Sequence, residues 1–139
     1  MVVIGSGATA ATLVPAMADD VGHITMLQRS PTFFITGRNS NDVADMLREL
    51  EIPEEWTHEI VRRKILHDQG QLNALAKDHP DLVRGELLNA IREILGEDYD
   101  VDTHFNPRYR PWQQRIAFVP EADLFVGIKA GKASVVTCG

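Results

Sequence analysis

Short apolar runs lie near both ends of the chain, and amphipathic patterns fill its middle. The apolar runs predict strands at residues 2–4, 23–28, 116–119 and 133–137. Residues 8–20 carry apolar side chains at helical spacing, although Pro15 should kink that helix or loosen its first turns. Residues 120–130 predict a further helix, which Gly131 ends. Strands and helices therefore alternate at both ends of the chain.

The middle of the chain predicts helices throughout. Four apolar stripes fall at residues 43–50, 60–65, 72–76 and 83–95. We expect Pro53 to end the first helix, Pro80 to begin the fourth and Gly96 to end it. A normal crossover between parallel strands needs fewer than four helices. We therefore predict that residues 38–103 are a helical insertion that packs against another part of the protein, such as a domain outside this sequence.

The turn after the first strand has the spacing G-x-G-x-x-A. Gly5 would allow a tight turn, Gly7 would let the backbone approach a pyrophosphate, and the small Ala10 would let the next helix pack closely on the sheet. The N-terminus of that helix would then point at the phosphates. The spacing alone is a weak signal, because a strand, turn and helix without a ligand fit it too. Its place between an apolar run and a helical segment favours dinucleotide binding.

The end of the second strand indicates which dinucleotide. In an NAD site, an Asp or Glu about 20 residues after the glycines bonds the ribose 2′-hydroxyl. Here the strand ends Gln28-Arg29-Ser30, with no carboxylate. Arg29 would bind a 2′-phosphate in a bidentate fashion, and Ser30 would add a hydroxyl donor. A solvated arginine at a strand end is the plain alternative, but next to the glycine turn this pair favours NADP(H).

The composition is that of an ordinary soluble protein, 44% hydrophobic and 24% charged, with a single cysteine and thus no internal disulfide. The sequence has no membrane-spanning run and no signal-peptide pattern, so we expect a cytoplasmic protein without a membrane partner. Residues 38–103 hold 8 Lys and Arg against 16 Asp and Glu, a net of −8, so the chain total of −6 leaves +2 elsewhere. This balance argues against nucleic acid as a partner. The histidines and acidic residues lack the spacing of metal ligands, so we expect no metal site.

Residues 103–115 predict a long irregular loop, because Pro107 and Pro111 prevent regular structure. Three arginines and two aromatic residues crowd its second half: Arg108, Tyr109, Arg110, Trp112 and Arg115. A long loop of this content is either a binding loop or an exposed connector.

Three segments together resemble flavin-containing monooxygenases. Residues 2–10, 26–33 and 107–115 occur in that family in the same order, and the second and third are far more specific than the glycine turn. The likeness covers residues 1 to about 137 and looks closest to the Baeyer–Villiger type, in the ethionamide-activating branch. It implies an NADP domain with a helical insertion, set into an FAD domain. The implied activity is oxygenation of a small-molecule ketone or sulfide through a peroxyflavin, with NADPH and FAD as cofactors.

The resemblance implies a role for eight residues. The turn that binds the NADP pyrophosphate matches Gly5, Ser6, Gly7, Ala8 and Thr9, and the 2′-phosphate contacts match Arg29 and Ser30. Arg115 matches an active-site arginine over the flavin, where a fixed cation would stabilise the anionic peroxyflavin. Without the resemblance, a surface ion pair is an equal alternative for this residue. Several relatives carry a Lys just before this arginine, and here Gln114 takes its place.

The FAD-binding elements that the resemblance implies are not in this sequence. The family's first glycine turn and its F-x-G-x-x-x-H-x-x-x-W fingerprint should lie upstream, and further strands should follow the last residue. We therefore expect an α/β fragment with a partial Rossmann-like parallel sheet, inactive without the FAD domain. Residues 1–37 would form its first βαβ part, 38–103 the helical insertion, and 104–139 the active-site-type loop with the βαβ end. The alternative is a free-standing nucleotide-binding or interaction module without redox activity.

Overall fold

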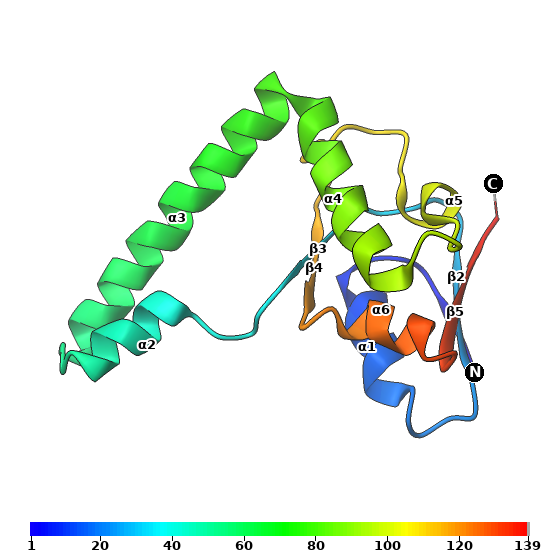
Figure 1. Ribbon diagram of the computed structural model, residues 1–139, viewed down its shortest axis with the longest axis horizontal. Helices are drawn as coiled ribbons and strands as arrows, with labels where there is room; N and C mark the ends of the chain where they lie inside the picture. The colour runs from blue at the N-terminus through cyan, green and yellow to red at the C-terminus, as the bar shows by residue number, and fades with distance from the viewer. Residues whose placement is uncertain (139) are drawn as a thin grey trace.

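A computed structural model describes residues 1–138 as an α/β structure with two small parallel sheets and six helices (Figure 1). The elements are, in chain order, β1 (Val2–Ile4), α1 (Ala8–Met17), β2 (Ile24–Gln28), β3 (Phe34–Gly37), α2 (Asp42–Glu49), α3 (Glu54–Asp78), α4 (Pro80–Leu95), α5 (Val101–Phe105), β4 (Ala117–Pro120), α6 (Asp123–Lys129) and β5 (Ala133–Thr137). None of the helices between residues 1 and 138 combines the length and apolarity that crossing a bilayer requires.

The larger sheet has the order β1-β2-β5, with every pair parallel. Along the central strand, Ile24, Met26 and Gln28 point inward and are buried, as the period-two pattern of a strand requires. Helices α1, α5 and α6 pack against the sheet from one side (Figure 1). On the opposite face the outer strands leave apolar residues exposed, with Ile4 at 83%, Val2 at 60% and Val136 at 44%, while Thr25 and Leu27 of the central strand are half-buried. Parallel sheets are usually covered on both faces, and this one is covered on one.

The smaller sheet pairs β3 with β4 in parallel and shares the same hydrophobic core. Phe34 of β3 makes edge-to-face contacts with Phe105 of α5 and Phe125 of α6, at ring-centroid distances of 5.8 and 5.9 Å. Phe105 and Phe125 themselves meet at 5.3 Å. These three buried rings join both sheets and two helices into one core. Strands β4 and β5, although consecutive in the chain, therefore belong to different sheets.

Helices α2 and α3 form an arm that projects from the body. Its far end is the junction between them, and α3 brings the chain back to a corner where α4 begins (Figure 1). The separate helices expected around residues 60–65 and 72–76 are wrong, because α3 runs unbroken over 25 residues. Side-chain pairs one turn apart carry the helix through this polar stretch, including Lys64–Asp68 and His67–Gln71. Gly70 is tolerated inside it, since glycine weakens a helix but does not end it.

The other predicted elements are confirmed with small shifts. Helix α1 ends at Met17, with Pro15 inside it. Helix α4 begins at Pro80 and ends at Leu95, and the Gly96 that caps it has a φ of +94°. Two elements were not predicted. Strand β3 follows Pro31 as a short aromatic and β-branched run, and α5 occupies the start of the predicted loop.

Helix α5 has a local signal of its own. The side chain of Asp100 accepts a hydrogen bond from the Thr103 amide at 3.0 Å and caps the helix. The hydrogen bonds from Thr103 lower the pKa of the Asp100 carboxyl below its usual value. This cap fixes where the helix begins, and Phe105 at its end reaches the core.

We expect Phe105→Ala to lower the free energy of unfolding by about 3–5 kcal/mol, because it leaves a cavity at the centre of the aromatic core. The matched control is Phe118→Ala on β4, where the ring is 46% exposed and the loss should be about 1 kcal/mol. Urea unfolding followed by circular dichroism measures both values. Equal losses for the two variants would contradict this account of the core.

Candidate functional site

Three segments meet at one edge of the larger sheet, because its strands are parallel and all their carboxyl ends lie there. The turn after β1 brings Gly5 to Gly7, the end of β2 brings Arg29 and Ser30, and the end of β5 brings Thr137. In open α/β sheets, ligands bind beyond the carboxyl ends of the strands. The edge is therefore the place to look for a site.

The turn after β1, residues 5–10, which we call the glycine turn, leaves the helix N-terminus open. Gly5 has a φ of +118°, which favours glycine, and its amide donates to the Leu27 carbonyl of β2 at 2.8 Å. Gly7 caps α1 without a side-chain hydrogen bond, and the first turn has no acidic residue. Apart from Gly7 itself and its two neighbours in the chain, no protein atom lies within 4 Å of the place where a Cβ of Gly7 would stand. The first amides of α1 are therefore free to meet an anion.

Ser6 connects the glycine turn to the segment after β2. Its hydroxyl donates to the Ser30 carbonyl at 3.1 Å and lies 3.0 Å from the Thr32 hydroxyl. Ala10 is buried, so α1 packs closely on the sheet as predicted, whereas Ala8 and Thr9 are exposed at the start of the helix. The structure thus brings the two predicted parts of the site together.

Arg29 and Ser30 lie on the wall of a hollow of about 480 Å³, which we call the Arg29 hollow. Its other polar side chains come from α5, the loop after it and β5: Asp102, Thr103, Asn106, Arg108, Tyr109 and Thr137. The Asp102 carboxylate is already engaged, since one oxygen accepts from Arg92 at 2.9 Å and the other from Asn106 at 3.1 Å. Positive charge therefore prevails on this wall.

Buried Gln28 holds the back of the Arg29 hollow in place. Its amide nitrogen donates to the His104 carbonyl at 2.7 Å and to the Thr137 hydroxyl at 2.8 Å. The Nδ1 atom of His104 lies 2.9 Å from the same hydroxyl. Three elements, β2, α5 and β5, are thereby fixed behind Arg29.

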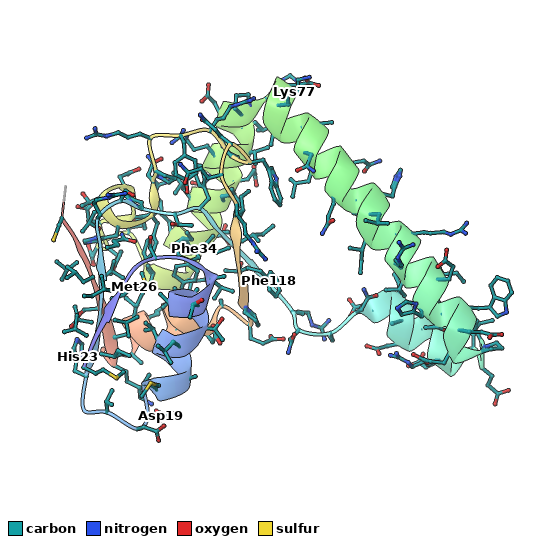
Figure 2. The ribbon with its side chains drawn as sticks, turned by 180° about the vertical axis from the view of Figure 1, so that it is seen from behind. Asp19, His23, Met26, Phe34, Lys77 and Phe118 are labelled. Atoms are coloured by element: carbon teal, nitrogen blue, oxygen red, sulfur yellow. The ribbon has the colours of Figure 1, made fainter. Side chains whose placement is uncertain are left out.

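The loop between α5 and β4, residues 106–116, which we call the arginine loop, distributes its three arginines to three places. Arg108 lines the Arg29 hollow. Arg110 lies beside Asn73 and Lys77 of α3, at the corner with α4 that Figure 2 labels by Lys77. Arg115 lines a third hollow, of about 210 Å³, together with Gly7 and Ala8. We call it the glycine-turn hollow. Residues that crowd together in the sequence thus serve different surfaces.

The structure brings the predicted catalytic and cofactor residues to one side of the molecule. Tyr109 lines both the Arg29 hollow and the glycine-turn hollow, so the two are neighbours. Among residues 1–138, Arg29, Arg108 and Arg115 have no carboxylate oxygen within 4 Å. The surface ion pair considered for Arg115 is therefore not formed. In the same part of the chain, no group of three His, Cys, Asp or Glu side chains is placed to hold a metal ion.

Sequence reasoning missed Arg84 of α4, which positions the arginine loop. Its guanidinium donates to the Asn106 side chain at 2.6 Å, to the Pro107 carbonyl at 2.7 Å and to the Tyr109 carbonyl at 2.8 Å. It also lies 5.3 Å from the centre of the buried Phe33 ring, a cation–π contact. The sequence did contain a signal for Arg84. It precedes the apolar Leu87 and Leu88 by one helical turn, which places it on the inward side of the helix.

A separate apolar groove of about 420 Å³ lies between α3, α4 and β3, away from this edge. Its wall is formed by leucines such as Leu72 and Leu87, together with Phe34, and only Thr36 and Glu86 are polar. Figure 2 shows Met26 and Phe34 inside the body and Phe118 on the side of β4 toward the arm. The groove has no cation, so it does not compete as a phosphate site.

The chain is similar to curated proteins over nearly its whole length. It is 44% identical over 138 residues to the FAD-containing monooxygenase EthA of Mycobacterium tuberculosis, and 41% identical to EthA of Mycolicibacterium smegmatis. It is 42% identical to the probable FAD-binding monooxygenase AlmA of Acinetobacter baylyi. Over these residues the chain is similar to FAD-containing monooxygenases. The resemblance stated from the residues is therefore confirmed.

The matches cover 99% of this chain but only 27–28% of the relatives, so the chain spans little more than a quarter of their length. No protein-family model matches the chain. The relatives' names state FAD and monooxygenase, and they do not specify a second cofactor. The shared segment is therefore one portion of a longer flavoprotein sequence in these relatives.

We expect Arg84→Lys to loosen the arginine loop, because an ammonium group lacks the fork that reaches three acceptors at once. The backbone amides of residues 108–110 and 112–115 should exchange hydrogen faster, and the free energy of unfolding should fall by about 1–3 kcal/mol. Hydrogen exchange followed by mass spectrometry, with urea unfolding, measures both effects. Arg63→Lys is the control, since its pair with Glu59 is exposed and contributes little. Unchanged exchange in the loop would show that Arg84 does not hold it.

Proposed function

We propose that this chain is the NADP(H)-binding portion of an FAD-dependent monooxygenase of the Baeyer–Villiger type, with a Rossmann-like arrangement of its larger sheet. The observation that carries the proposal is a hydrogen bond between the two parts of the candidate site. The Ser6 hydroxyl of the glycine turn donates to the carbonyl of Ser30, the residue next to Arg29. A pyrophosphate at the open end of α1 and a 2′-phosphate at Arg29 would then belong to one molecule.

The residues present fit an NADP molecule. The positive φ of Gly5 and the open space at Gly7 give the backbone room to approach the pyrophosphate. Ala8 and Thr9 would offer the amides of the first helical turn, and an acidic residue that would repel the phosphates is absent there. The end of β2 offers a guanidinium and a hydroxyl where an NAD site would carry a carboxylate. These features favour NADP(H) over NAD(H).

Arg115 is the proposed catalytic residue. It lies in the glycine-turn hollow beside Gly7, so a nicotinamide dinucleotide at the turn and the guanidinium would share one space. A bound flavin, held by the FAD-binding portion, would supply the oxygen activation and would oxygenate a ketone or sulfide substrate. Arg115 would present a fixed positive charge to it, a preorganised group that costs no rearrangement during the reaction.

The uncovered face of the larger sheet supports a place within a larger protein. Ile4 and Val2 expose most of their side chains there, although parallel sheets are usually covered on both faces. We propose that the FAD-binding portion covers this face. In that arrangement residues 1–37 and 104–139 are the parts that bind NADP, and residues 38–103 are an insertion. The chain alone would be inactive as an oxygenase.

We expect Gly7→Ala to weaken the binding of NADPH and of NADH alike, by about tenfold or more. The added methyl group would stand in the open space that the pyrophosphate needs, while the fold keeps its stability to within about 1 kcal/mol. Isothermal titration calorimetry measures both affinities. Gly22→Ala is the matched control, because its Cβ also meets no protein atom within 4 Å but lies in the loop before β2. Equal affinities for the two variants would remove the glycine turn from the site.

We expect Arg29→Ala to weaken NADPH binding by about 1–3 kcal/mol, since a bond to a charged phosphate is lost. The affinity for NADH should stay the same, because NADH has no 2′-phosphate. The control is Arg38→Ala, an exposed arginine paired with Asp42 at the start of the arm. If the unaltered chain binds NADPH and NADH equally, or binds neither, the NADP assignment fails. Binding of neither would favour an interaction module without a redox role.

A further inference from the structure

The Arg29 hollow contains a second arginine that the sequence did not assign to any ligand. Arg108 comes from the arginine loop, far from β2 in the sequence, and it lines the same hollow as Arg29 and Ser30. Arg84 holds the carbonyl of the preceding residue, Pro107, at 2.7 Å, so the backbone that carries Arg108 is fixed.

The charges in the hollow match a dianion better than a monoanion. A phosphate monoester carries about −1.5 to −2 charges near pH 7, and one guanidinium balances only part of that charge. Among the residues the structure describes, neither Arg29 nor Arg108 has a carboxylate within 4 Å. The carboxylate that does line the hollow, Asp102, is bound by Arg92 and Asn106. Two unneutralised guanidinium groups thus share a space of about 480 Å³.

We infer that Arg108 is the second cation of the 2′-phosphate site and sets the preference for NADP(H) together with Arg29. This inference rests on the proposed function and adds a specificity-determining residue to it. Arg29 approaches the phosphate from the end of β2, and Arg108 approaches it from the arginine loop. Each offers a planar fork that bonds two phosphate oxygens.

The neighbouring arginines do not fit this role. Arg110, two residues further along the same loop, lies beside Lys77 of α3 in another hollow. Arg115 lies beside Gly7 and Ala8 in the glycine-turn hollow. Of the three arginines of the loop, only Arg108 lines the hollow that contains Arg29. The chain therefore provides its own matched control in Arg110, which has the same charge and is also exposed.

The test compares Arg108→Ala with Arg110→Ala in the full chain, by calorimetric titration with NADPH, NADH, 2′,5′-ADP and 5′-AMP. Arg108→Ala should weaken NADPH and 2′,5′-ADP by about 10- to 100-fold, since a charge-assisted fork is lost. NADH and 5′-AMP, which lack the 2′-phosphate, should keep their affinities. Arg110→Ala should change none of the four. Arg108→Lys should recover part of the affinity, because it restores the charge without the fork.

A double variant shows whether the two arginines share one phosphate. The losses from Arg29→Ala and Arg108→Ala should not add, and the double variant should bind NADPH no better than NADH. If Arg29→Ala removes the NADPH preference while Arg108→Ala behaves like Arg110→Ala, the inference is overturned and the proposed function stands. An equal loss of NADH with Arg108→Ala would assign this residue a structural role instead. If the unaltered chain has no preference for NADPH, both ideas fail together.

Discussion

The central position of β2 is the constraint on which the site depends. Because β1 and β5 both pair with this strand in parallel, the segments that follow all three strands leave at one edge. The hydrogen bond from the Gly5 amide to the Leu27 carbonyl continues the pairing beyond β1 and ties the glycine turn to β2. Ser6 then bonds the segment after β2 directly. The meeting of residues 5–10 with residues 29–30 therefore follows from strand pairing, without any contact inside the arm.

The second half of the site depends on a different kind of support. The arginine loop has no strand partner over most of its length, so side chains must hold it in place. Arg84 binds two of its carbonyls and one of its side chains, and Phe105 anchors the helix before it in the aromatic core. The bonds of Arg84 are charge-assisted and partly buried, so they contribute more than a surface ion pair would. A helix of the insertion thus positions residues that line both hollows.

Local patterns were enough to predict the elements that form the sheet edge, and the comparisons confirm the resemblance to FAD-containing monooxygenases. The glycine turn and Arg29 could be found because their spacing is fixed by one strand, one turn and one helix. Pairing between distant segments could not be found in the same way. Strand β3 is four residues long, and its partner β4 lies some eighty residues away in the sequence. A single helix α3 was missed because a change from apolar to polar side chains looks like a break when no tertiary contact is known.

The contacts of Arg84 and the place of Arg108 beside Arg29 lay beyond sequence reasoning for a related reason. Three arginines within eight residues look equivalent in the sequence, and only the path of the loop separates them. Arg84 resembles any polar residue at the edge of an amphipathic helix until the carbonyls that it binds are placed beside it. Spacing identifies a site when one local motif builds it. Where two distant segments build it, the fold must be known first.

The distribution of charge has a physical logic of its own. Several carboxylates of the arm pair locally, as in Arg38–Asp42 and Arg63–Glu59, and no ion pair within residues 1–138 joins the arm to the arginines at the sheet edge. Exposed guanidinium groups without partners cost little stability, because water solvates them and surface ion pairs contribute little in any case. The same groups contribute far more when an anion arrives with its own charge and fixed oxygen atoms. Within residues 1–138 the chain can therefore keep Arg29, Arg108 and Arg115 without an ion pair at small cost to folding, and that is the arrangement a phosphate-binding surface requires.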